Sequence, residues 1–497
     1  MAIRTLLCCR AVPVPHLALS GGEELAAGFA AIRAEMGVAE TMPADVEAAA
    51  AAAQADTAPR ADRRDIALRT LDPAGSRDLD QACHLARDGD GYVLRYAIAD
   101  VAAWVRPGDL VDAEAWRRGC TVYCPDLRAP LHPTSLSEGR ASLLPGQDAP
   151  AVLWTLRIDA AGRCIDTHVE RATVRSRGAL DYTGLQAWFD AGAVSDTDHD
   201  DSVALLRDVG EALLVAEAAR GGVSLTLPSQ VVEPDGDRFV LRYEAALRTE
   251  AWNAQLSLCC GAAAAALMLD AGVGLLRTLP PADPADLARL REASTSLGVP
   301  WPEATSYPDW VRTIDPTTPE GTALMVAASR TLRGAGYVAF DGAAPALHEH
   351  SALAMPYAHV TAPLRRLGDR FATECALAAA AGRRPPGWAL DALGSIAATM
   401  EETGQRASSV NRACIDLTEV TVLAPLVGQS FEGTVTTVDD RGRATVQLYD
   451  PAVIASADMP EGTRDGSVVE VRLASVDLTR RRPHFVAITP AQTSRVP

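Results

Sequence analysis

Three carboxylates stand within nine residues of the segment 70–81, at Asp72, Asp78 and Asp80. The segment also contains a proline and a glycine, which are typical of turns. Like charges held this close raise one another's pKa unless a cation lies among them. Mg²⁺ prefers oxygen ligands and is usually held by one or two carboxylates together with phosphate oxygens of a substrate. The cluster therefore predicts a magnesium site and a phosphorylated substrate, and the alternative is a solvated acidic turn.

A second segment, 356–370, carries adjacent arginines at Arg365 and Arg366. Thr361 suits an N-cap and Pro363 suits the first turn of a helix over 363–381, which predicts free backbone N–H groups and a partial positive charge at this point. Arginines at this positive end of a helix are unfavourable unless an anion such as phosphate neutralises their charge. The alternative is that both arginines pair with carboxylates such as Asp369.

The remaining pattern predicts the elements that position these two segments. After a short N-terminal region with two helical stretches and a linker, strands are expected from residue 65 onward, including 92–99 and 151–158, which are apolar and β-prone. The helices expected later in the chain span 249–271, 284–297, 322–334, 363–381 and 390–422.

Beyond residue 425 the alternation typical of strands returns, over 428–438, 443–448, 467–473 and 484–488. Several short strands in about 65 residues predict a small β-barrel, with the OB-fold as first choice. We therefore expect an α+β, multidomain protein. Its parts are an N-terminal helical region and linker (1–60), a mixed α/β domain that includes the C-terminal helices (61–425), and the barrel (426–492).

Composition limits the partners of this chain. The 46 basic and 64 acidic residues give a formal net charge of −18, which argues against non-specific coating of nucleic acid but leaves a local basic channel open. The chain contains no lysine, so a cationic side chain that contacts phosphate must be an arginine. No secretory signal and no apolar run long enough to span a bilayer are expected, so we predict a cytoplasmic protein without a membrane partner.

The acidic segment and the arginine segment together resemble the ribonuclease II/R family, bacterial 3′→5′ exoribonucleases built around a catalytic RNB domain. The resemblance covers about residues 64–425, and a terminal RNA-binding OB module follows in the family where the predicted barrel lies here. The matching stretches, in order, are Asp72–Gln81, Tyr96–Val105, Thr121–Tyr123, Pro130–Ser137 and Tyr357–Arg366.

The resemblance implies hydrolysis of single-stranded RNA from its 3′ end to nucleoside 5′-monophosphates, in RNA turnover. It implies that Asp72, Asp78 and Asp80 hold Mg²⁺, with Mn²⁺ as an alternative, and organise the attacking water. Asp80 matches the position on which the family depends most, and Asp80, Asp78 and Arg365 are the expected catalytic residues. Arg365 matches the arginine at the scissile phosphate, and Tyr123 resembles the aromatic residue that stacks on a terminal base.

The chain departs from the family pattern at Gln81, where better-known members have a metal-ligating aspartate. Gln81 offers an amide oxygen without charge, which weakens the predicted Mg²⁺ site. The region before residue 60 is too short for the paired RNA-guiding modules of larger relatives, so grip on RNA would depend on the catalytic channel, including Arg366, and on the barrel. Phe431 and the run 480–482 are candidate RNA contacts there, and the alternative for Phe431 is the barrel core.

Two other functions remain open from the sequence. One is a protein that binds RNA 3′ ends with weakened or lost catalysis, for which Gln81 is the main argument. The other is a metal-dependent phosphoesterase acting on another nucleic acid. The joint presence of the three carboxylates and Arg365 favours the exoribonuclease, acting as a monomer.

Overall fold

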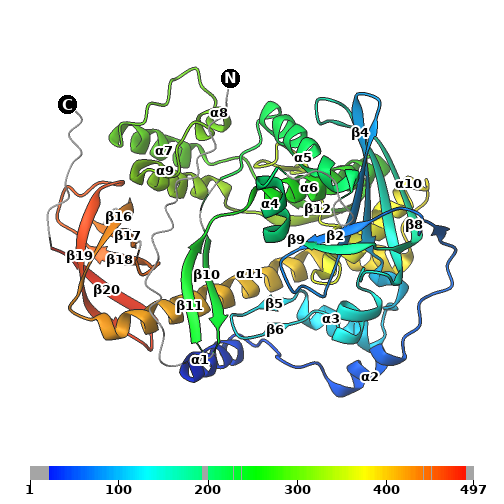
Figure 1. Ribbon diagram of the computed structural model, residues 1–497, viewed down its shortest axis with the longest axis horizontal. Helices are drawn as coiled ribbons and strands as arrows, with labels where there is room; N and C mark the ends of the chain where they lie inside the picture. The colour runs from blue at the N-terminus through cyan, green and yellow to red at the C-terminus, as the bar shows by residue number, and fades with distance from the viewer. Residues whose placement is uncertain are drawn as a thin grey trace.

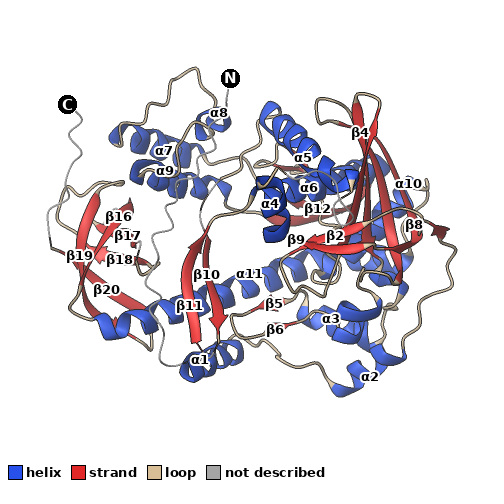
Figure 2. Cartoon of the chain, in the orientation of Figure 1, coloured by secondary structure: helices blue, strands red, loops and turns tan. Residues whose placement is uncertain are grey.

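The structure is a computed structural model of the chain, and it describes residues 22–192, 200–225, 227, 229–236, 238–439, 442–448 and 450–488. The first 21 residues of the predicted N-terminal region lie outside the described residues. A large sheet with its covering helices occupies one side of the molecule, and a small barrel occupies the other (Figures 1 and 2). The long helix α11 (Gly387–Leu423) runs between them.

A seven-stranded sheet forms the centre of the larger part, in the order β1-β8-β7-β4-β3-β2-β9. Its neighbours pair antiparallel except for β1 with β8 and β2 with β9. In sheet order, the strands are Ala61–Asp62, Cys164–Arg175, Asp148–Ile158, Gly91–Ala99, Gln81–Asp88, Arg69–Asp72 and Gly178–Asp181.

The central strands β4 and β7 are buried on both faces, which explains their mostly apolar sequences. Along β4, Leu94, Tyr96 and Ile98 pack into the largest hydrophobic core, on the face covered by helices. Ala97 and Ala99 point the other way, into a second core. The expected strands 92–99 and 151–158 are confirmed as β4 and β7.

Helices cover this sheet and extend from it. Their bounds are α1 Gly22–Glu35, α2 Ala44–Ala52, α3 Leu110–Arg118, α4 Tyr182–Asp190, α5 Asp201–Ala219, α6 Arg248–Ala271, α7 Pro284–Ser296, α8 Tyr307–Val311, α9 Pro319–Ser329, α10 Leu367–Ala380 and α11. The helices expected over 249–271, 284–297 and 390–422 are confirmed within a few residues at each end. The one expected over 322–334 begins at Pro319 and ends earlier, at Ser329, before a 3-10 turn.

The expectation that no apolar run could span a bilayer is wrong for α6, which is long and apolar enough by length and composition alone. Half of its most apolar stretch is buried within the protein. Trp252, Leu256 and Met268 of α6 belong to the largest core. The buried amides of Asn253 and Gln255 hydrogen-bond to Tyr182 and Glu217, so α6 is integrated into this domain by polar as well as apolar contacts.

The helix expected from Pro363 begins four residues later, at Leu367. Thr361 does not cap it, because its hydroxyl lies 2.9 Å from the Ser257 hydroxyl and is buried. Residues 361–366 instead form a turn, in which the N–H groups of Ala362 and Leu364 donate to carboxylates of Asp369 and Asp80. The arginines therefore precede the helix.

Short two-stranded pairs connect the helices and the sheet. They are β5 Val122–Tyr123 with β6 Arg128–Ala129, β10 Ser229–Asp235 with β11 Arg238–Glu244, β12 Val273–Thr278 with β13 Gly336–Asp341, and β14 Glu349–His350 with β15 Met355–Pro356.

The C-terminal strands close into a five-stranded barrel in the order β16-β17-β18-β20-β19, which confirms the expected barrel. The strands are β16 Ser430–Val438, β17 Arg443–Leu448, β18 Ile454–Asp458, β19 Val468–Asp477 and β20 Arg482–Ala487. The sequence pattern missed β18, whose residues carry a single β-branched side chain. Glu419 of α11 joins the barrel to the larger part, because its carboxylate accepts hydrogen bonds from the Ile454 N–H and the Gln230 amide.

The described part of the N-terminal region packs against the larger domain. Phe29 of α1 meets Phe239 of β11 edge-on, with ring centroids 5.3 Å apart. Arg33 forms ion pairs with Asp126, in the turn between β5 and β6, and with Glu40. The linker expected over 55–64 includes β1, which pairs with β8. This region therefore braces the β5–β6 hairpin.

Candidate active site

Two segments separated by 284 residues meet at Asp80. The side chain of Asp80 is 4% exposed, and its Oδ1 accepts a hydrogen bond of 2.7 Å from the Leu364 N–H. Its Oδ2 lies 3.5 Å from Nε of Arg365. Burial raises the pKa of Asp80 to about 8, and Arg365 opposes this rise. The structure thus brings together the predicted acidic residue and the predicted phosphate-binding arginine.

The loop that carries Asp78 and Asp80 is fixed by hydrogen bonds from a neighbouring segment. The Ser142 hydroxyl accepts from the Leu79 N–H at 2.9 Å and donates to the Arg77 carbonyl at 2.7 Å. Leu79 itself is buried in the second core, so its two acidic neighbours are turned away from that core.

Asp72 ends β2 and lies beside this loop. Its Oδ2 is buried and has no hydrogen-bond partner among the described residues. Burial raises the pKa of Asp72 to about 6, Arg365 opposes the rise, and Asp78 adds to it. A buried carboxylate oxygen without a partner is costly, so this atom is suited to a cation.

Asp78 has a partner that the sequence analysis missed. Arg128 donates to Asp78 at 2.5 Å and also forms an ion pair with Glu138. Arg128 stands opposite Tyr123 in the β5–β6 hairpin. The turn signal of Pro125 and Asp126 could have predicted this hairpin, and with it the pairing of Tyr123 and Arg128.

Gln81 begins β3 next to the acidic loop, and its amide oxygen accepts a hydrogen bond from the phenol of Tyr96 on β4. A cation at this position would compete with Tyr96 for the same oxygen. The prediction that Gln81 contributes a metal ligand stays a prediction.

Tyr123 lies at the mouth of the site and is 48% exposed. Its pKa rises to about 12 through burial of part of the ring, with Asp78 and Asp80 adding to the rise and Arg365 opposing it. The phenol is therefore protonated at neutral pH and lies within electrostatic reach of all three charged residues. An exposed aromatic ring in this place can stack on a base.

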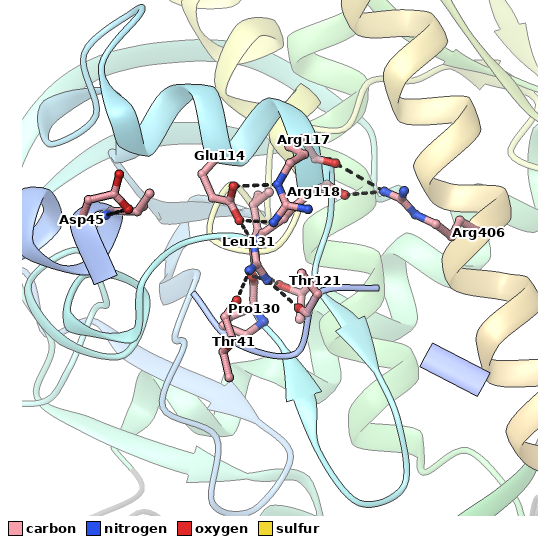
Figure 3. Close-up of polar contacts among 11 residues, drawn as sticks. Thr41, Asp45, Glu114, Arg117, Arg118, Thr121, Pro130, Leu131 and Arg406 are labelled. Atoms are coloured by element: carbon pink, nitrogen blue, oxygen red, sulfur yellow. Dashed lines mark hydrogen bonds and ion pairs between the residues drawn. The ribbon is translucent and has the colours of Figure 1, made fainter. Parts of the chain in front are cut away.

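The chain before Tyr123 is held by an arginine cluster (Figure 3). Arg118 donates to the carbonyls of Thr41 and Pro130 and pairs with Glu114. Arg406 of α11 donates to the Arg118 carbonyl at 3.2 Å. These contacts tie the hairpin to the N-terminal region, to α3 and to α11.

The hairpin is also bonded directly to the arginine segment, because the Thr121 N–H donates to the Arg365 carbonyl at 3.0 Å. Arg366 makes a two-pronged ion pair with Asp369, at 2.9 and 2.8 Å. The alternative expected from the sequence, that both arginines pair with carboxylates such as Asp369, therefore holds for Arg366. Arg365 instead faces Asp80, and its side chain is 44% exposed.

The candidate RNA contacts of the barrel lie on a different part of the molecule (Figure 1). Phe431 is half-buried and meets Phe485 of the barrel core edge-on at 6.1 Å. Arg480 and Arg482 are exposed where β19 turns into β20, whereas Arg481 is partly buried and pairs with Glu35 of α1. The structure does not bring these residues to Asp80.

The described residues contain no group of three or more His, Cys, Asp or Glu side chains arranged to hold a metal ion. The predicted set of three carboxylates is not assembled as ligands, because Asp78 turns to Arg128 and Asp80 turns to Leu364 and Arg365. Mg²⁺ commonly uses one or two carboxylates with water and substrate phosphate. The unpartnered oxygen of Asp72 beside these residues fits such a site.

Comparison with known families identifies the protein's class. Residues 60–375 match the RNB domain, and residues 429–488 match the RNase II-type exonuclease C-terminal S1 domain. The chain belongs to the RNB-domain exoribonucleases of the ribonuclease II/R family, which confirms the resemblance. The α/β domain followed by a five-stranded barrel confirms the expected fold class, with the barrel of S1 type.

Ribonuclease R of Vibrio cholerae is 26% identical over 407 residues, which are 77% of this chain and 49% of that protein. Ribonuclease R of Escherichia coli is 26% identical over 494 residues, 88% of this chain and 58% of that protein. The chain spans about half the length of these curated relatives.

Among solved structures, Mycoplasma genitalium RNase R in complex with ribose-methylated single-stranded RNA has a TM-score of 0.84 at 20% identity, covering 94% of this chain and 78% of that one. Yeast Ssd1, described as a pseudonuclease, has a TM-score of 0.65 at 15% identity, covering 85% of this chain and 52% of that one. These similarities show a shared fold.

Proposed function

We propose that this protein is a Mg²⁺-dependent 3′→5′ exoribonuclease that hydrolyses single-stranded RNA to nucleoside 5′-monophosphates. We further propose that it acts as a monomer in RNA turnover in the cytoplasm. The main support for the proposal is the set of contacts at Asp80. Its buried carboxylate accepts a hydrogen bond from the Leu364 N–H and faces Arg365, and the unpartnered oxygen of Asp72 lies nearby.

In this proposal each residue of the site has a separate role in phosphodiester hydrolysis. Arg365, half exposed, is available to neutralise the charge that develops on the non-bridging phosphate oxygens. Asp80 holds the Arg365 side chain at 3.5 Å and orients the attacking water through its carboxylate. Tyr123 stacks on a terminal base and aligns the 3′ end with these groups.

Asp72 and Asp80 would hold the divalent cation, with Asp78 joining them if it leaves Arg128, and Gln81 as an uncharged oxygen ligand. When bound, Mg²⁺, or Mn²⁺ in its place, would supply Lewis-acid chemistry at the phosphodiester. Asp72 and Asp80 carry pKa values raised by burial, so a bound cation would favour their charged forms.

Two units of the chain would grip the RNA in this proposal: the catalytic unit, residues 61–425, and the barrel, residues 426–492. A positive groove with stacking aromatics is how such barrels bind single strands. The exposed Arg480 and Arg482 of the run 480–482 supply positive charge on the barrel, and Phe431 offers only a half-buried ring. At the catalytic end, Arg366 would contribute charge that Asp369 largely neutralises.

One observation favours a second function, an RNA 3′-end-binding protein with weak or lost catalysis. Asp78 is paired with Arg128, and Gln81 stands in place of a carboxylate and is engaged with Tyr96. A protein with this arrangement could bind RNA through Arg365 and Tyr123 without cutting it.

A direct test separates the two functions. A 5′-labelled single-stranded RNA oligomer and a DNA oligomer of the same sequence are incubated with the protein in Mg²⁺ and in EDTA. The exoribonuclease predicts that only the RNA, and only with Mg²⁺, shortens in one-nucleotide steps with release of 5′-monophosphates. Binding of the RNA without shortening in Mg²⁺ would establish the second function instead.

A further inference from the structure

A pocket of about 680 Å³ opens beside Arg365. Tyr123 and Arg365 line one side, and Arg277 of β12 and Tyr337 of β13 line another. Small and polar residues of α11, including Ser408, complete it. We call it the Arg277 pocket. Because it includes both Tyr123 and Arg365, any nucleotide bound at the proposed active site lies at its edge.

Arg277 is held in this pocket by an aromatic ring. It is the cross-strand partner of Tyr337, and its guanidinium carbon lies 4.7 Å from the centre of the Tyr337 ring. A cation over a ring face is attracted by the ring quadrupole. This attraction uses none of the five N–H donors of the guanidinium.

The supporting ring is itself fixed. The Tyr337 phenol lies 2.7 Å from Nδ1 of His359, and the two rings meet edge-on at 5.6 Å. Burial lowers the pKa of His359 well below its ordinary value, and Arg366 and Arg277 lower it further. The imidazole is therefore neutral and can accept the phenol's hydrogen bond. This network positions the face of Tyr337 under Arg277 before any ligand binds.

The charge of Arg277 lacks a carboxylate counterpart. Over the ranges that the structure describes, Arg277 has no ion pair and no side-chain hydrogen bond. By contrast, Arg128 and Arg366 near the same site are each paired with carboxylates. Glu401, the acidic residue of the pocket lining, accepts a hydrogen bond from Gln405 at 3.4 Å. The pocket therefore contains two arginines, Arg277 and Arg365, whose guanidinium groups have N–H donors available for a ligand.

We propose that Arg277, held over Tyr337, binds a second phosphate position beside Arg365, filled by a phosphate of the bound RNA or of the released nucleotide. A planar guanidinium with free donors is matched to the two oxygens of a phosphate. The inference rests on the proposed function for its substrate class, an RNA. The phosphate has two possible sources. One is the RNA backbone phosphate next to the scissile one, and the other is the 5′-phosphate of the released mononucleotide, which is the scissile phosphate itself after cleavage and would move from Arg365 to Arg277.

The test compares wild type, Arg277→Gln and a matched control, Arg384→Gln, which removes an exposed arginine paired with Asp341. Affinity for labelled oligo(A) is measured in EDTA, so that no cleavage intervenes, across a series of salt concentrations. Competition by 5′-AMP and by adenosine is measured in the same assay. Thermal melting checks that each variant is folded.

For a backbone phosphate, Arg277→Gln weakens oligo(A) binding about tenfold and reduces the slope of log affinity against log salt by about 0.7, the value for one phosphate of a single strand. For a product phosphate, the slope stays as in wild type and competition by 5′-AMP falls to the level of adenosine. Either result supports the site, and Arg384→Gln leaves all of these quantities unchanged. A folded Arg277→Gln protein with wild-type affinity, slope and 5′-AMP competition would overturn the inference.

A second variant keeps the test decisive if Arg277→Gln fails to fold. Arg277→Lys retains the charge and loses the planar fork, so we expect several-fold weaker binding with the salt slope retained. Wild-type oligo(A) binding together with wild-type competition by 5′-AMP in this variant would overturn the inference. The proposed function is judged separately: wild type that never shortens RNA in Mg²⁺, while Arg277→Gln loses oligo(A) binding, would reject catalysis and support the phosphate site.

Discussion

The backbone N–H of Leu364 donates a 2.7 Å hydrogen bond to the carboxylate of Asp80, which joins the acidic loop after β2 to the turn before α10. The next residue along that turn, Arg365, places its guanidinium at the other carboxylate oxygen. One buried aspartate therefore fixes the position of the arginine that would neutralise a phosphate, and Arg365 in turn opposes the rise in the pKa of Asp80 that burial causes.

Arg365→Gln should lower the rate of RNA cleavage by roughly 100-fold to 1000-fold, because one preorganised donor to a charged transition state is typically worth that much. Arg365 is 44% exposed, so the melting temperature should change little. Single-turnover cleavage and thermal melting measure the two quantities. Arg383→Gln, which removes an exposed arginine beyond α10, serves as the control. Equal cleavage by Arg365→Gln and the control would contradict the assigned role.

Tyr123→Ala should weaken the hold on the last nucleotides and leave longer final products, because stacking on a base is worth about 1–3 kcal/mol. Tyr123→Phe keeps the ring and should keep the wild-type product length. Since the side chain is half exposed, neither variant should unfold the protein. High-resolution gels of limit digests give the product lengths. Identical products from the alanine and phenylalanine variants would rule out stacking.

Gln81→Asp should lower the Mg²⁺ concentration needed for half-maximal activity, because it adds a charged oxygen ligand beside Asp80. Tyr96→Phe removes the phenol that donates to the Gln81 oxygen and should act in the same direction but more weakly. Mg²⁺ titrations of initial rates measure the effect. A higher Mg²⁺ requirement in Gln81→Asp would show that this position does not face the metal.

Mg²⁺ should raise the melting temperature of the wild-type protein, because a cation that binds only the folded state stabilises it by mass action. Asp72→Asn should abolish this increment, since it replaces the charged carboxylate whose oxygen has no partner. Asp391→Asn, at an exposed position of α11, should retain it. Differential scanning fluorimetry with and without Mg²⁺ gives the result, and an undiminished increment in Asp72→Asn would place the metal elsewhere.

Glu419, which connects α11 to the barrel, is expected to make the stability of the protein depend on pH. Burial raises the pKa of Glu419 from 4.5 to about 7, and hydrogen bonds from Ile454 and Gln230 oppose the rise. A carboxyl group whose pKa is higher in the folded state than in the unfolded state stabilises the fold at pH below the unfolded-state pKa. This stabilisation is lost as the pH rises through the folded-state pKa. Glu419→Gln keeps an oxygen for both donors, so its melting temperature should match that of wild type at pH 4 and exceed it at pH 8, by the order of 2–4 °C. Glu402→Gln, exposed on the same helix, should show no such difference, and a lower melting temperature of Glu419→Gln at pH 8 would contradict this assignment.

Local pattern was sufficient to predict β4, because its apolar residues serve two cores, and α11, because no proline interrupts residues 387–423. It also identified both segments of the site. It could not place the start of α10, because the turn before that helix is held by Asp80 and by Ser257, which are distant in sequence. The pairing of Asp78 with Arg128 and of Gln81 with Tyr96 was missed for the same reason, since each depends on how separate strands come together.

We propose that Asp80 is the catalytic centre of an RNA 3′-end hydrolase, and this role is tested by a time course with a 5′-labelled poly(A) oligomer. Wild type and Asp80→Asn are compared in Mg²⁺, with EDTA as the metal-free control and binding of the same oligomer measured in parallel. We predict a ladder that shortens from the 3′ end with wild type, and no ladder with Asp80→Asn although it still binds the oligomer. A ladder that forms at the wild-type rate with folded Asp80→Asn would exclude this role for Asp80.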